Sequence, residues 1–258
     1  MRELRFEEVT VRYGTRRHGT VAVERLNLTI PAGQVVGLVG ESGSGKSTLA
    51  RAAVGLTPVT AGRILLDGEP VRRGWRAGPQ PMQMVFQDPY SSLDPRMTVG
   101  ASIAEAMPRG QSRPQRRAEV ARLLDLVELA ADRADVYPAE LSGGQRQRVA
   151  LARALAGQPQ VIIADEITSA LDVSIQGTVL NLVRDLQRRM RLTMLFISHN
   201  LAVVRYVSDH IAVMYHGRLV ESAPADEVLT NPQDPYTREL LEAAGQGSHD
   251  TSQQRRSG

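Results

Sequence analysis

The sequence has 258 residues, of which 42% are hydrophobic, 4% aromatic and 23% charged, and its formal net charge is +3. This length allows one sizeable hydrophobic core with room for a small second lobe. The few aromatic side chains and the modest charge argue against a surface that stacks nucleic acid bases, so no nucleic acid partner is expected.

Three features of the sequence bear on where the chain works. The longest apolar runs, such as 161–164 and 194–197, fall far short of the roughly 20 residues that span a bilayer. The sequence starts with charged residues where an export signal needs an apolar region. It contains no cysteine, which excludes disulfides and thiolate metal sites. We therefore expect a cytoplasmic protein that does not cross the membrane by itself.

The basic residues are almost all arginine. The 31 basic side chains comprise thirty arginines and a single lysine, Lys46. Arginine clusters at 72–73 and 113–117 could touch nucleic acid, but a solvated polar surface is the better interpretation.

The first 67 residues contain mostly strand patterns. Apolar and polar side chains alternate over 4–13 and again over 26–30, which predicts antiparallel strands. Residues 35–39 form an apolar run typical of a buried parallel strand, and a helix is expected from 46 to about 55. Residues 62–67 predict a further strand.

The middle of the chain changes from loop to helix. Residues 70–81 are rich in proline, glycine and arginine and predict a mobile surface loop, and 82–86 predicts a strand. From about 90 to 156 the pattern is helical, with one apolar face that includes Val120, Leu123, Leu124 and Val127. We interpret 90–156 as a helical insertion.

The rest of the chain returns to buried strands. Strands are predicted at 161–164, 194–197 and 211–214, with a helix from about 175 to 189. Alternation of this kind is typical of a doubly wound α/β fold. The polar residues 245–258 predict a disordered tail after one domain that spans 1–244.

A glycine-rich segment between a predicted strand and a predicted helix matches the phosphate-loop pattern. Glycines let backbone N–H groups converge on phosphates, and the helix dipole adds attraction. The pattern assigns the lysine to the outer phosphates and the following serine to Mg²⁺. The alternative is a chance glycine loop, which the strand and helix on either side disfavour. The candidate ATP-binding residues are Gly40, Glu41, Ser42, Gly43, Ser44, Gly45, Lys46, Ser47 and Thr48.

Two acids end the apolar strand at 161–164 and so lie at the carboxyl edge of a parallel sheet, where ligands bind. Asp165 suits Mg²⁺ coordination. Glu166 is placed to polarise an attacking water, because phosphoryl transfer needs a positioned nucleophile. The signal is moderate by itself, since acids at strand ends often cap helices.

The segment 141–148, Leu-Ser-Gly-Gly-Gln-Arg-Gln-Arg, is the most specific feature of the chain. Its serine and two glycines begin a helix and offer a second anion-binding N-terminus. A plain serine-capped helix would account for three of these residues but not for eight. We call 141–148 the signature segment.

Together these motifs identify a resemblance. The phosphate loop, the signature segment and the Asp-Glu strand end occur in the order typical of ATP-binding-cassette (ABC) ATPases, and the resemblance covers roughly 1–241. It implies an α/β fold of the P-loop NTPase type with an antiparallel β subdomain and a helical insertion. It also implies ATP hydrolysis with Mg²⁺.

The resemblance assigns roles to further residues. Tyr13 resembles the aromatic residue that stacks on adenine, Gln87 the glutamine that senses Mg²⁺ and the transport partner, and His199 the switch histidine near the terminal phosphate. Taken singly, they could be a core tyrosine, a turn residue and a buried histidine. The implied catalytic residues are Glu166, His199, Lys46 and Gln87, and the implied Mg²⁺ ligands are Ser47, Gln87 and Asp165.

In this family two cassettes pair head to tail, so that the signature of one closes over the ATP of the other. The resemblance therefore implies a second ABC ATPase subunit, identical or not, as a partner. Asp172 belongs to the loop expected to cross between the paired subunits. The residues implied to contact the partner's nucleotide are Ser142, Gly143, Gly144 and Gln145.

Segments 86–95 and 231–241 resemble those of bacterial oligopeptide, dipeptide and nickel importer ATPases. They favour a peptide importer subunit on the cytoplasmic side of the inner membrane, with separate permease subunits and, indirectly, an extracytoplasmic binding protein. The importer-type C-terminal segment spans 221–244. Nickel, another small solute, a phosphonate-processing complex and a cassette acting on DNA or ribosomes remain alternatives. Two departures from the family are Ile167, where proline is usual, and Asn200, where aspartate is common.

Overall fold

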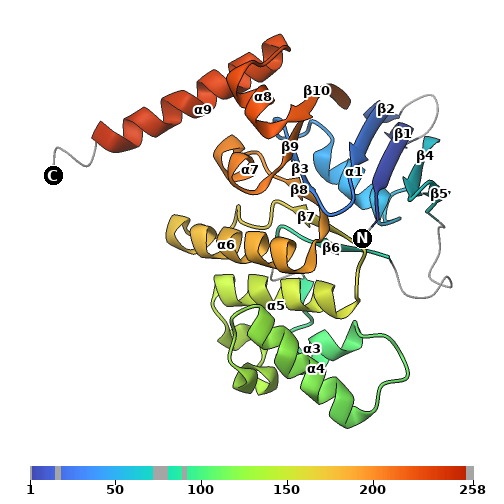
Figure 1. Ribbon diagram of the computed structural model, residues 1–258, viewed down its shortest axis with the longest axis vertical. Coiled ribbons are helices and arrows are strands. Elements are labelled where there is room, and N and C mark those ends of the chain that lie inside the picture. The colour runs from blue at the N-terminus through green and yellow to red at the C-terminus, as the bar shows by residue number, and fades with distance from the viewer. Residues whose placement is uncertain (1, 15–18, 72–80, 89–91, 254–258) are drawn as a thin grey trace.

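The computed structural model describes residues 2–14, 19–71, 81–88 and 92–253, with the backbone alone at 173 and 245–253. Most of the loop expected at 70–81 therefore lies outside the described residues. The strands form two sheets, and helices lie between and beside them (Figure 1). No helix within the described ranges has both the length and the apolar character that spanning a membrane requires.

The first sheet is antiparallel and has four strands, as the alternating patterns predict. Leu4 pairs with Ile30 and Phe6 with Leu28, so the buried side chains of the first two strands share one face. The second strand begins at Thr20, six residues before the start predicted from the apolar alternation. In spatial order the strands are β2 (Thr20–Ile30), β1 (Leu4–Tyr13), β4 (Ala61–Leu66) and β5 (Glu69–Pro70).

The second sheet has six strands and carries the expected doubly wound core. Five of its strands are parallel, and one edge strand, β10, runs antiparallel to its neighbour. This edge strand was not predicted, because its side chains are mostly half-buried and lack an apolar run. In spatial order the strands are β10 (Arg218–Pro224), β9 (His210–Tyr215), β3 (Val35–Val39), β8 (Thr193–Ile197), β7 (Val161–Asp165) and β6 (Met82–Val85).

The six-stranded sheet separates two hydrophobic clusters. In β3, Val35 and Val39 belong to one cluster, whereas Val36 and Leu38 belong to the other. This division follows from the two-residue period of a strand. One cluster joins the sheet to helix α1 and the antiparallel sheet, and the other joins it to the remaining helices (Figure 1). Both faces of the parallel sheet are therefore covered.

Helices connect the strands of the second sheet. The helix predicted at 46–55 ends at Ala53, and the helix predicted at 175–189 is slightly longer in the structure. The later short helices were not predicted. These elements are α1 (Lys46–Ala53), α6 (Val173–Met190), α7 (Leu201–Val207), α8 (Ala225–Thr230) and α9 (Pro235–Gln253).

The helical insertion forms the lower part of the molecule in Figure 1. The apolar face predicted from Val120, Leu123, Leu124 and Val127 is buried, and α5 packs against β6 and α6. This contact joins the insertion to the parallel sheet. Its elements are α3 (Val99–Glu105), α4 (Arg113–Leu126), the 3₁₀ turns η1 (Ala131–Asp135) and η2 (Pro138–Glu140), and α5 (Gly143–Ala156).

The C-terminal tail corrects one prediction. We expected disorder over 245–258, but α9 continues as a helix to Gln253, and only 254–258 lie outside the described residues. A polar composition does not by itself prevent a helix from continuing. Once the first turns of α9 are formed, each added residue gains a backbone hydrogen bond without a new nucleation cost.

Candidate active site at the edge of the parallel sheet

The glycine-rich loop connects β3 to α1 and has the backbone shape of a phosphate cradle. Gly40 and Gly45 have φ angles of +149° and +105°. A Cβ atom would lie 2.0 Å from the Met214 carbonyl oxygen at the first glycine and 2.2 Å from that of Ala22 at the second. Only glycine fits such positions. Gly45 is also the N-cap of α1, so the loop leads into the positive end of a helix dipole.

The side chain of Lys46 lies inside this loop. Its ammonium group donates to the Gly40 carbonyl oxygen at 2.8 Å, to the Glu41 carbonyl oxygen at 2.7 Å and to Ser44 Oγ at 3.3 Å. Burial lowers the pKa of Lys46, while the nearby carboxylates of Glu166 and Asp165 act in the opposite direction. Three acceptors thus compensate the burial of this charge. Of the other loop residues, Glu41, Ser42 and Gly43 are exposed.

Ser47 and Asp165 form a pair of oxygen donors beside the lysine. Ser47 Oγ donates to Asp165 Oδ1 at 3.0 Å. Burial raises the pKa of Asp165, and the serine hydrogen bond opposes this. Among the described residues no group of three or more His, Cys, Asp or Glu side chains could hold a metal ion. The pair nevertheless suits Mg²⁺, which takes one or two protein oxygens and completes its shell with phosphates and water.

Glu166 and His199 meet at the same sheet edge. Glu166 follows β7 directly, His199 follows β8 after one residue, and Glu166 Oε2 lies 3.2 Å from His199 Nδ1. The imidazole is more than half exposed and the carboxylate mostly covered, at 57% and 17% side-chain exposure. The interpretation of His199 as a buried core histidine is therefore wrong. Glu166 also has φ +49°, a strained angle for a residue with a side chain and of a kind that clusters at functional sites.

The two departures from the family pattern are both accommodated. Ile167 is 1% exposed and packs in the core, while the preceding carbonyl of Glu166 accepts from the Ser169 backbone N–H at 3.1 Å and its hydroxyl at 2.9 Å. The turn is thus held without proline. Asn200 caps α7, since its Oδ1 accepts from the Ala202 N–H at 3.0 Å.

Tyr13 and Gln87 lie beside the Lys46, Asp165 and Glu166 cluster on different elements. Tyr13 ends β1 and is 45% exposed, so it is not a core residue, and its hydroxyl lies 3.4 Å from Thr48 Oγ1 on α1. This hydrogen bond lowers the pKa of Tyr13. Gln87 is exposed and lies two residues beyond Val85, the last residue of β6. Val85 pairs with Ala164 on β7, and Glu166 lies two residues beyond Ala164. Register therefore brings Gln87 to the same edge.

The structure does not bring the signature segment into this cluster. Ser142 is the exposed N-cap of α5, where it and Gln145 form a capping box with distances of 3.0 and 3.3 Å. A Cβ on Gly144 would lie 2.5 Å from Ile175 of α6, so this glycine permits close packing of the two helix starts. Gly143 lies beside Leu171, next to the exposed Asp172. The signature residues and Asp172 thus form a second group, in which Ser142 and Asp172 are exposed and Gly144 is buried.

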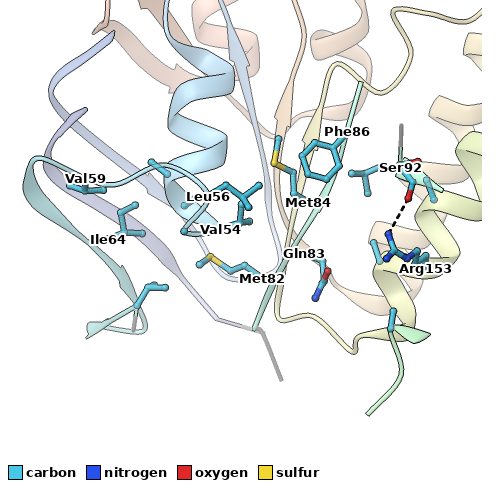
Figure 2. Close-up of a pocket in the computed structure, with 18 of the residues that line it drawn as sticks. Val54, Leu56, Val59, Ile64, Met82, Gln83, Met84, Phe86, Ser92 and Arg153 are labelled. Carbon is cyan, nitrogen blue, oxygen red and sulfur yellow. Dashed lines mark hydrogen bonds between the residues drawn. The ribbon is translucent and has the colours of Figure 1, made fainter. Parts of the chain in front are cut away.

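A pocket of about 810 Å³ lies outside both groups. Figure 2 shows apolar side chains, among them Leu56, Met82 and Met84, on one side and Arg153 on the other. Arg153 donates to the Ser92 carbonyl oxygen at 3.0 Å and pairs with Glu105. The lining also includes Phe86, the residue before Gln87, so the pocket adjoins the active-site edge without containing it.

Two contacts to the phosphate loop were not predicted from the sequence. Tyr236 at the start of α9 accepts a hydrogen bond from the Glu41 backbone N–H at 3.0 Å, across 195 residues of chain. Gly217, between β9 and β10, donates its N–H to the Ser44 carbonyl oxygen at 2.9 Å. The importer-like segment 231–241 marks Tyr236 as unusual, but no local pattern links it to the loop.

Comparison with known proteins decides the family. The sequence model described as "ABC transporter" matches residues 23–169. The chain belongs to the ABC transporter family. This cassette is 51% identical over 234 residues to the oligopeptide transport ATP-binding protein OppF of Bacillus subtilis, an alignment that covers 87% of the chain and 77% of that protein. It is 49% identical over 237 residues to a putative peptide import ATP-binding protein of Brucella ovis, with 90% and 75% covered.

Solved structures agree with this placement. The ATP-binding cassette MJ0796, in a dimeric post-hydrolysis state bound to ADP and Pi, has a TM-score of 0.76 at 29% identity and covers 86% of the chain and 98% of its own. CbiO1 of Clostridium perfringens, part of the ABC transporter complex CbiONQ, has a TM-score of 0.77 at 28% identity, with 88% and 90% covered. The predicted α/β fold of the P-loop NTPase type is confirmed, and so is the assignment of the cassette as an ATPase.

Proposed function

We propose that this cassette is the ATP-hydrolysing subunit of a bacterial peptide importer and powers transport through separate permease subunits. The observation that carries the ATPase part is the convergence of Lys46, Asp165 and Glu166 at one sheet edge. The relatives named for oligopeptide transport and peptide import support the cargo, since they are about half identical over most of the chain.

ATP binds in the phosphate loop with its adenine against the exposed ring of Tyr13. Lys46 and the N–H groups at the start of α1 neutralise the outer phosphates. Ser47 and Asp165 would hold Mg²⁺, with Gln87 as a further ligand from beyond the end of the neighbouring strand β6. When bound, Mg²⁺ neutralises charge on the phosphates. The buried carboxylate of Asp165 suits a cation site, because a divalent cation favours its charged form.

Glu166 orients the attacking water and accepts its proton. Its carboxylate is mostly covered, and the backbone N–H of Glu166 donates to the Ile197 carbonyl oxygen of β8 at 2.9 Å, so the side chain starts from a fixed point. His199 is held by the same carboxylate and presents the rest of its ring to the terminal phosphate. A positioned carboxylate and a fixed donor supply the orientation that phosphoryl transfer requires.

A second cassette completes the site. The signature residues lie at the N-terminus of α5, where the N-cap Ser142 is exposed. In a head-to-tail pair, Ser142, Gly143, Gly144 and Gln145 contact ATP held by the partner, and Asp172 lies in the loop between the subunits. The dimeric MJ0796 cassette supports this arrangement.

The permease docks at the pocket beside β6. The pocket adjoins Gln87 through Phe86, so an occupant there reaches the residue assigned to sense both Mg²⁺ and the transport partner. Apolar side chains line one side, and Leu56 is 58% exposed, which suits an apolar segment of a permease loop. This docking places the cassette on the cytoplasmic side of the inner membrane as a peripheral subunit.

A charge placed at this pocket is expected to separate docking from nucleotide chemistry. Leu56→Glu should abolish co-purification with co-expressed permease subunits of a peptide importer, because the acid would have to be desolvated in an apolar contact. Binding of MgATP by the isolated variant should stay within about twofold of wild type, since a change at an exposed surface position costs little stability.

The matched control is Tyr206→Glu, an exposed apolar-to-acid change on α7, away from the pocket. It should leave co-purification intact. Undiminished association of Leu56→Glu with the permease would contradict the docking site, and failure of wild type to associate with any permease would count against the importer itself.

A further inference from the structure

The importer-like segment 231–241 has no role in the function proposed so far, yet it touches the phosphate loop. It forms the link from α8 to α9 and the first turns of α9. Its contact is Tyr236, whose hydroxyl accepts from the Glu41 backbone N–H at 3.0 Å. A C-terminal helix thus reaches a loop formed near the start of the chain.

Tyr236 is itself held firmly. Glu221 on β10 accepts from the backbone N–H groups of Gln233 and Asp234 at 2.8 and 3.1 Å. Asp234 Oδ1 then accepts from the backbone N–H of Tyr236 at 2.8 Å. These three bonds fix the turn that precedes α9 on the edge strand of the parallel sheet. The backbone of Tyr236 is therefore held in place by hydrogen bonds.

The ring of Tyr236 packs on the end of β9. It lies 4.1 Å from the Tyr215 ring, centroid to centroid, at an interplanar angle of 32°. Tyr215 follows Met214, whose carbonyl oxygen closely approaches Gly40. Burial raises the pKa of Tyr236, so its hydroxyl stays protonated near neutral pH. The phenol can be changed at its hydroxyl without losing this ring contact.

The hydrogen bond to Tyr236 acts on the same peptide unit that contacts the phosphate-loop lysine. The peptide between Gly40 and Glu41 gives its N–H to Tyr236, and its carbonyl oxygen accepts from Lys46 at 2.8 Å. The C=O and N–H of a trans peptide lie in one rigid plane, so fixing one end fixes the other. This peptide unit therefore links the C-terminal helix to the ammonium group of Lys46.

We propose that Tyr236 is a positioning residue for ATP binding: its hydroxyl fixes the Gly40–Glu41 peptide and, through that carbonyl, the ammonium group of Lys46. This inference rests on the proposed role of the phosphate loop. It gives the segment 231–241 a function in nucleotide affinity, and it makes the ATP site dependent on how α9 is seated.

The test is Tyr236→Phe, which removes the hydroxyl and keeps the ring. The Kd and KM for MgATP of the full chain should rise about 3- to 10-fold, the range that loss of one hydrogen bond produces. The value of kcat should change less than about twofold, because Glu166 and His199 are untouched. A split between KM and kcat is not expected from a general loss of stability.

The matched control is Tyr206→Phe, which removes another tyrosine hydroxyl, bonded to Asn181 on α6, far along the chain from the loop. Its Kd for MgATP should equal that of wild type. Equal Kd values for Tyr236→Phe and wild type, or the same rise in both variants, would overturn the inference.

Two further variants keep the outcome decisive. Glu221→Gln weakens the hydrogen bonds that hold the turn before α9, and it should raise the Kd for MgATP about two- to threefold. This result is expected even if Tyr236→Phe fails to fold. An unchanged Kd for Glu221→Gln would then overturn the inference. Lys46→Ala separates the two claims. Weak binding by Lys46→Ala with normal binding by Tyr236→Phe contradicts only the role of Tyr236, whereas normal binding by Lys46→Ala contradicts the phosphate-loop assignment.

Discussion

Glu166→Gln should lower the rate of ATP hydrolysis by about 100- to 10,000-fold, the usual contribution of a general base. The amide has the same shape but cannot accept the proton of the attacking water. Because Lys46, Ser47 and the phosphate loop are unchanged, the Kd for MgATP should stay within about threefold of wild type. Phosphate release measures the first quantity, and titration calorimetry measures the second.

Glu119→Gln is the control for this change. Glu119 lies on α4 and pairs with Arg122 at 2.7 Å on the surface of the helical insertion. Loss of that pair should leave hydrolysis unaltered, because surface ion pairs contribute little. If Glu166→Gln hydrolyses ATP as fast as Glu119→Gln, the assignment of the base is wrong.

Lys46→Ala should weaken MgATP binding itself, by about 10- to 100-fold, because a hydrogen bond to a charged group is worth more than a neutral one. The loss differs from that in Glu166→Gln, since affinity falls along with turnover. A fluorescent ATP analogue titrated against wild type and variant gives the two Kd values directly.

Lys46→Arg sharpens the same test in a chain that uses arginine at every other basic position. The three acceptors around the ammonium group converge on one compact charge, which a planar guanidinium cannot replace. We expect Lys46→Arg to bind as weakly as Lys46→Ala. The exposed Arg51→Lys on the same helix should bind normally. Wild-type affinity in Lys46→Arg would mean that charge alone suffices at this position.

The parts of the fold that follow from the sequence are those set by local patterns. Apolar runs at 161–164 and 194–197 are buried strands because every side chain on both faces is covered. The edge strand β10 carries no such run, so its pattern resembles a loop. The end of α9 was misjudged for a different reason, since polar composition indicates exposure but does not prevent a helix from continuing.

The residues of the site also divide into those that local motifs predict and those whose contacts depend on the tertiary fold. Short motifs contain most of the site: the glycines of the phosphate loop, Lys46, Ser47, Asp165 and Glu166. The side chains of the last four meet because parallel strands end at one edge of the sheet. The contact between Glu166 and His199 depends on strand order, which the sequence does not state. The bond from Tyr236 to Glu41 depends on where α9 packs, and no periodicity predicts it. The roles of the signature residues stay predictions, because these residues are expected to act on ATP held by a second cassette.

The most direct test of the proposed function is ATP hydrolysis by the cassette in proteoliposomes with its permease subunits and binding protein. Addition of an oligopeptide should stimulate hydrolysis several-fold and drive uptake of the labelled peptide, and Glu166→Gln should abolish both. Hydrolysis that ignores the peptide, with no uptake in the presence of MgATP, would contradict the assignment as a peptide importer subunit.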